Sequence, residues 1–161
     1  MKPFDLSLET YDLIGMRTAA ATRTPANIAI FKVVEGKAPH ALAELVRSGV
    51  RASAFDEVAS CLRLPKMELA KRIGIVFRTV SRKAARPEAR LSSDATARIL
   101  RVVRVRNLAR HLFMTDAAVA DWLNTPDSAL YNRAPLDLLD TEYGAAEVEN
   151  LLGGMLHGFC A

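Results

Sequence analysis

The ionisable side chains of this chain are unevenly distributed along its length, and their distribution indicates what kinds of partner it binds. Residues 60–113 carry 14 Lys and Arg against three acids, Glu68, Glu88 and Asp94. Residues 114–161 carry eight acids and one base, Arg133, although the whole chain has a net charge of only +4. A compact basic segment is typical of proteins that bind a polyanion such as nucleic acid. The acidic segment predicts a second partner, a protein with a basic surface.

Side chains that catalyse reactions or bind metals have no recognisable arrangement in this sequence. His40, His111 and His157 lack metal-ligand spacing, and no Ser-His-Asp order, glycine-rich phosphate loop or carboxylate pair stands out. Cys61 and Cys160 are too few for a disulfide framework, so we expect reduced thiols in a cytoplasmic protein. No apolar run approaches the roughly 20 residues of a membrane-spanning helix. We therefore predict no catalytic residue, metal, cofactor or membrane contact.

Apolar residues recur at helical spacing over most of the chain and predict an all-α fold. Two short amphipathic segments end before Gly49 and Pro65. Ser92 or Ser93 can then cap a long helix over residues 94–113. Residues 28–34 are compatible with either a strand or a short helical turn, and their type stays open at this stage.

The last third of the chain is also predicted to be helical. Thr115 or Asp116 can cap a short helix that holds Trp122. A final helix is expected after Gly144 and through about residue 156. Gly153 and Gly154 fall inside it, and because glycine is about 1 kcal/mol worse than alanine in a helix, we expect a bend or fraying there.

The segment 67–83 has the pattern of two short helices joined by a tight turn. Ala70 is small enough for close helix contact, and Gly74 can adopt the positive φ that the turn needs. Ile75 and Val80 are placed to seal the pair of helices. This spacing resembles the helix-turn-helix of Xre-type, phage-repressor-like regulators. The alternative interpretation is a helical hairpin with a solvated basic face.

The resemblance implies which side chains meet DNA, because the second helix of such a motif enters the major groove. Arg78, Ser81 and Arg82 would then face base edges, where arginine can bond a guanine through O6 and N7. Neighbouring side chains would contact phosphates. The predicted DNA-binding residues are Arg78, Thr79, Ser81, Arg82, Lys83 and Arg86.

A second motif lies in the acidic segment. A Trp-Leu pair at 122–123 is followed by Pro126-Asp127 and then by Pro-Leu-Asp-Leu-Leu-Asp-Thr at 135–141. Together with the upstream motif, over roughly residues 60–161, this pattern resembles the Xre/MbcA/ParS antitoxins with their toxin-binding domain. The resemblance implies a partner that is a RES-domain toxin, which consumes NAD, and an antitoxin that represses its own operon.

Within that resemblance, the acidic module and its apolar tail are the candidate toxin-binding surface. Residues 155–161 end in a carboxylate after an acidic helix, and we expect them to plug the active-site cleft of the toxin. The predicted toxin-binding residues are Asp137, Glu147, Asn150, Leu151, Met155, His157, Phe159 and Ala161.

These observations predict an all-α protein with three parts. Residues 1–59 form an N-terminal extension and candidate dimerisation region, 60–113 a helix-turn-helix with a long basic helix, and 114–161 a small toxin-binding module. The expected partners are a RES-domain toxin, operator DNA and a second copy of the chain, which would dimerise through the long Arg-rich helix or the N-terminal helices. The alternative is a free-standing repressor whose C-terminal module only dimerises.

Overall fold

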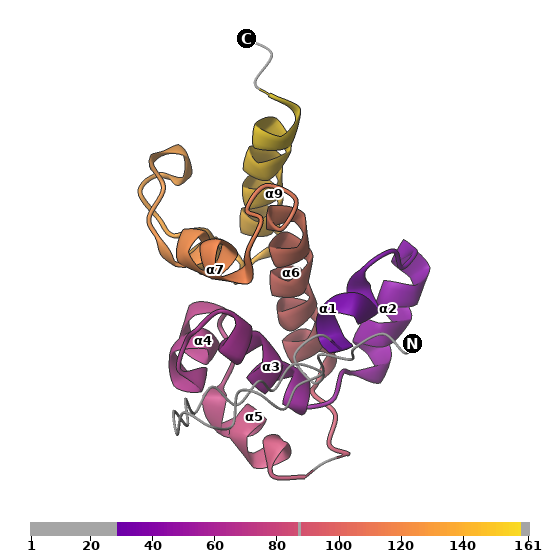
Figure 1. Ribbon diagram of the computed structural model, residues 1–161. Helices are drawn as coiled ribbons and strands as arrows, with labels where there is room; N and C mark the ends of the chain where they lie inside the picture. The colour runs from indigo at the N-terminus through magenta and orange to yellow at the C-terminus, as the bar shows by residue number, and fades with distance from the viewer. Residues whose placement is uncertain (1–28, 87, 159–161) are drawn as a thin grey trace, which may run out of the picture.

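The computed structural model describes residues 29–86 and 88–158, and these residues form helices packed around a central one, α6 (Figure 1). The described part contains no strand, only isolated bridges, so the predicted all-α fold is confirmed. The segment near residue 30, whose type the sequence left undecided, forms a helix. In chain order the elements are α1 (Ala29–Val34), α2 (Pro39–Ser48), α3 (Ser53–Cys61), α4 (Lys66–Arg72), α5 (Phe77–Ala84), α6 (Ser93–Ala109), α7 (Asp116–Asn124), a 3-10 helix (Ser128–Leu130), α8 (Pro135–Leu138) and α9 (Glu142–His157).

Helix α6 is the common support of the fold, because α1, α2, α3, α7 and α9 all pack on it. The Ser92 hydroxyl caps it by accepting the Ala95 N–H at 3.3 Å, as predicted. Its buried face is wider than one stripe since neighbours lie on several sides. The buried residues are Ala95, Thr96, Ile99, Leu100, Val102, Val103, Val105 and Ala109.

The end of α6 was predicted too late in the chain. The helix stops at Ala109 rather than Phe113. Beyond it Arg110 Nη1 donates to the Phe113 carbonyl at 3.0 Å, and the Phe113 ring stacks on Trp122 with centroids 5.3 Å apart. The chain must turn back to make this stack, so the helix cannot continue. The tryptophan thereby ties α7 to the end of α6.

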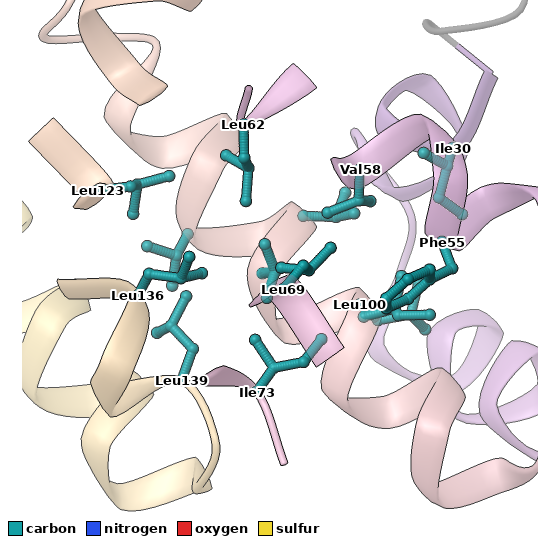
Figure 2. Packing of buried hydrophobic residues seen from close by; sticks show 14 of the residues in the cluster. Ile30, Phe55, Val58, Leu62, Leu69, Ile73, Leu100, Leu123, Leu136 and Leu139 are labelled. Atoms are coloured by element: carbon teal, nitrogen blue, oxygen red, sulfur yellow. The ribbon is translucent and has the colours of Figure 1, made fainter. Parts of the chain in front are cut away.

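The hydrophobic core is continuous from the N-terminal helices to α9. In Figure 2, Leu69 of α4 and Ile73, which directly follows that helix, lie beside Leu136 and Leu139, which belong to the segment around α8. Leu69, Ile73, Leu136 and Leu139 are each fully buried. The helix-turn-helix segment and the C-terminal segment therefore fold on one shared core rather than on two.

The start of α9 also differs from the prediction, and its second half is more regular than expected. The Thr141 hydroxyl accepts the Gly144 N–H at 3.1 Å, so the helix begins at Glu142 and contains Gly144 in its first turn. It continues without interruption through Gly153 and Gly154 to His157, so the predicted fraying at these glycines is wrong. Buried contacts of the helix upstream, including Leu152, hold it in place.

Candidate DNA and partner interfaces

The geometry of α4, its turn and α5 is that of a helix-turn-helix. Gly74 has φ 71°, a left-handed conformation that disfavours any residue with a Cβ. A Cβ at this position would also lie 2.5 Å from Arg98 Nη1. After the turn, the Ile75 N–H donates to the Ala70 carbonyl at 2.8 Å, and Val80 of α5 is buried. These local predictions from the sequence are confirmed.

The predicted DNA-contact residues lie on and just after α5. Arg78, Ser81 and Arg82 are exposed and share one face of the helix, opposite the buried side that carries Val80. Thr79 and Arg86 are exposed as well. Lys83 is half-buried, and its Nζ donates to the Arg90 carbonyl at 2.7 Å. The amine of Lys83 therefore already has a partner within the loop that follows α5.

Many of the acidic and basic residues that the sequence placed in separate segments pair with each other. Glu142 accepts from Arg101 at 2.9 Å and from Arg104 at 2.6 Å. Glu149 also pairs with Arg104, and Asp116 pairs with Arg106 and, at 3.1 Å, with Arg110. Much of the positive charge of α6 is thus neutralised by acids of the same molecule. Counting charges in each segment of the sequence could not reveal this pairing.

The positive charge that remains is concentrated around the helix-turn-helix. Within residues 29–86 and 88–158, seven bases of the basic segment have no carboxylate within ion-pair distance: Arg63, Lys71, Arg78, Arg82, Lys83, Arg86 and Arg90. All except Arg63 belong to α4, α5 or the loop that follows α5. This part of the surface is therefore the one best suited to a polyanion.

A buried arginine fastens the helix-turn-helix to the acidic module. Arg72, whose side chain is 13% exposed, donates from Nε to Asp137 Oδ1 and from Nη1 to Asn124 Oδ1, both at 2.5 Å. Asn124 in turn donates to the carbonyls of Leu62 at 3.2 Å and Ala120 at 2.8 Å. One carboxylate oxygen of Asp137, a predicted toxin-binding residue, is therefore already paired within the molecule.

A second arginine covers the turn of the motif. Arg98 Nη1 donates to the Ile73 carbonyl at 3.1 Å and to the Asp140 carbonyl at 3.3 Å. One guanidinium therefore joins the end of α4 to the junction between α8 and α9. The arginines at 72 and 98 were missed by sequence reasoning, because their partners lie far away along the chain and no local pattern marks them.

Two carboxyl groups have pKa values shifted in opposite directions. The hydrogen bond from Arg104 lowers the pKa of Glu142, and a second hydrogen bond from Arg101 lowers it further. Burial acts in the opposite direction but is outweighed. Burial raises the pKa of Glu57, and the hydrogen bond that it accepts from the Ile30 N–H at 3.4 Å only partly offsets that rise. Both residues connect separate elements, so their titration is linked to folding.

The remaining predicted toxin-binding residues lie on α9. Asn150, Met155 and His157 are exposed, whereas Glu147 and Leu151 are half-buried. By their spacing these five residues occupy about half the circumference of the helix. Asp137 does not belong to this helix, and Phe159 and Ala161 lie outside the described residues.

These features define an all-α helix-turn-helix protein with a second helical module built onto the same core. Residues 41–104 match the family model of the antitoxin Xre-like helix-turn-helix domain. Residues 108–158 match that of the antitoxin Xre/MbcA/ParS C-terminal toxin-binding domain. No helix in the described part of the chain is long and apolar enough to cross a membrane.

Two relatives carry the same family name. An antitoxin Xre from Yersinia enterocolitica is 34% identical over 118 residues, which are 73% of this chain and 79% of the relative. An antitoxin Xre from Photorhabdus laumondii is 32% identical over 121 residues, 74% of this chain and 80% of the relative. The chain belongs to the antitoxin Xre family.

Proposed function

We propose that this antitoxin-family protein binds its own operator DNA through α5 and neutralises an NAD-consuming RES-domain toxin through its C-terminal module. The observation that carries the proposal is the distribution of charge after internal pairing. Of the seven basic residues in the segment 60–113 that have no carboxylate partner among the described residues, six surround the helix-turn-helix. The C-terminal module, in the part that the structure describes, keeps four carboxylates without an ion-pair partner, Asp121, Asp127, Asp140 and Glu147, and matches a toxin-binding family model. Both targets would be met in the cytoplasm.

DNA binding rests on the exposed face of α5. Arg78 and Arg82 are positioned to read base edges, while Arg86 would contact a phosphate. One such module makes few contacts, so the protein acts as a homodimer with two recognition helices in successive major grooves about 34 Å apart. Sedimentation of a monomer at micromolar concentration, both free and on DNA, would exclude this arrangement.

The DNA-binding proposal is tested by measuring operator affinity at several salt concentrations. Arg82→Ala should make the free energy of operator binding less favourable by about 1–3 kcal/mol and relax the preference at one base pair. Arg86→Ala should weaken binding to all DNA sequences alike and reduce the slope of log affinity against log salt concentration by about one. Arg104→Ala is the matched control, because it removes the same charge from an arginine already paired with Glu142 and Glu149. Equal effects of all three substitutions would show that only net charge matters and would reject the recognition role of α5.

Toxin neutralisation would be a stoichiometric occlusion of the NAD site by α9 and the tail that follows it. Complementary charge speeds such an encounter more than it sets the final affinity. The exposed residues near the end of α9, Met155 and His157, lie beyond Leu152, the last buried residue of the helix. Their removal should therefore leave the core intact.

The test compares NAD consumption by the purified toxin with full-length protein and with a variant that lacks residues 155–161. We expect the truncated protein to bind operator DNA normally and to protect poorly against the toxin. Equal inhibition by both proteins would remove the tail from the mechanism. Absence of any toxin among proteins co-purified from the native operon would instead favour a free-standing repressor.

A further inference from the structure

The connection between α7 and α8 is a rigid loop rather than a flexible linker. The Asp127 N–H donates to the Arg133 carbonyl at 3.1 Å, and the Asn132 N–H donates to the Asp127 carbonyl at 2.9 Å. The Asp127 carboxylate accepts the Ala129 N–H at 2.9 Å. Leu130 is buried in the core, and Arg133 Nη2 donates to the Asp137 carbonyl at 2.9 Å. The loop is thus anchored to the body of the protein on both sides of its tip.

The tip of this loop adopts a backbone conformation that ordinary residues rarely use. Tyr131 has φ 56° and ψ 35°, and Asn132 has φ 59°. Both are left-handed, where the Cβ of an L-residue crowds the backbone; asparagine tolerates this better than tyrosine. Glycine would fit both positions without strain, yet no glycine occurs between residues 125 and 134. The tyrosine is therefore not accounted for by the needs of the turn.

The tyrosine ring is not accounted for by packing either. The residue is 77% exposed, immediately after fully buried Leu130. In Figure 1 the orange segment after α7 stands out from the body of the helices. A tyrosine held at a fixed position binds with little loss of side-chain entropy, and such residues are enriched among those that dominate protein interfaces.

We propose that Tyr131 is a preorganised contact of the C-terminal module with the toxin, separate from α9 and its tail. The proposal rests on the proposed function for its partner. The loop lies inside residues 108–158, which match the toxin-binding family model. DNA is a poor partner here, since residues 114–161 carry eight acids and one base. The matching feature on the toxin would be an apolar pocket with a hydrogen-bonding group at its rim.

The experiment measures the affinity of full-length variants for the purified toxin encoded in the same operon, together with their melting temperatures. Tyr131→Gly removes the ring and relieves the backbone, so toxin binding should weaken about 30-fold while the melting temperature holds or rises. Tyr131→Phe should retain most of the affinity. Asn132→Gly is the matched control, because it relieves the neighbouring residue and keeps the ring, and should bind within about twofold of the original protein.

Each alternative outcome points to a different error. If the original protein binds no toxin, the proposed function fails and this inference fails with it. If it binds and Tyr131→Gly binds equally well, only the role of Tyr131 is overturned. Equal weakening by Tyr131→Gly and Asn132→Gly would show that loop rigidity matters and the ring does not. A change in self-association alone, with toxin affinity preserved, would assign the tyrosine to contact with a second copy.

Discussion

Replacing Gly144 by alanine should destabilise the protein, although alanine is the better helix former. Gly144 lies in the first turn of α9, where it passes close to α8. A Cβ built on it would lie 2.1 Å from the carbonyl oxygen of Leu138, 2.9 Å from its carbonyl carbon and 3.1 Å from its Cβ. The first two atoms are backbone, so no side-chain rotation can relieve the overlap. The two helices must move apart at their contact.

The size of the effect follows from two opposing contributions. Helix propensity favours alanine by about 1 kcal/mol at most. Overpacking costs about 1–3 kcal/mol, and the upper end applies because α8 is held in place by the Arg72–Asp137 ion pair. The net loss is about 2 kcal/mol, which for a chain of this length lowers the melting temperature by roughly 4–8 °C.

The assay is thermal and urea unfolding followed by circular dichroism at the helix band. Gly153→Ala serves as the control within the same helix, since a Cβ there meets nothing within 4 Å. It should raise stability by about 0.5–1 kcal/mol through propensity alone. The reasoning is refuted if the melting temperature of Gly144→Ala equals or exceeds that of the original protein. It is also refuted if Gly144→Ala and Gly153→Ala shift the melting temperature in the same direction.

Three further substitutions test other contacts by urea unfolding. Arg72→Met should lower the free energy of unfolding by about 2 kcal/mol, since the carboxylate of Asp137, 39% exposed, loses its partner. Glu142→Gln should destabilise at pH 7, and the deficit should shrink as the pH falls below 4.5 and vanish only below the folded-state pKa of Glu142, which is depressed from its ordinary 4.5. Glu57→Gln should be neutral or stabilising at pH 7, because burial raises the pKa of Glu57 and its charged form disfavours folding above that pKa.

Features that depend on neighbouring residues were predictable from the sequence. The helix-turn-helix follows from Ala70, Gly74 and Val80, whose spacing reflects contacts within a few turns of chain. The cap at Thr115 follows equally from local chemistry, and its hydroxyl accepts the Ala118 N–H.

Features that depend on distant residues were not predictable. Arg72 and Asp137 are 65 positions apart, and their pairing follows only from the way α4 meets α8. The same holds for Arg104 with Glu149, 45 positions apart. Segment composition correctly indicated opposite charges but could not show that the two segments neutralise each other in part. The αL conformation of Tyr131 likewise had no local signal, because tyrosine rarely adopts it.

The position of α6 has a consequence for how the protein can be turned over. The two family matches end at residue 104 and begin at residue 108, so their junction falls inside one continuous helix, α6. Val102, Val103 and Val105 at this junction and Ala109 just beyond it are fully buried. A protease therefore finds no exposed connector between the halves, and cutting there requires the common core to open first. The helix-turn-helix and the toxin-binding segment therefore cannot be separated at this junction without unfolding both.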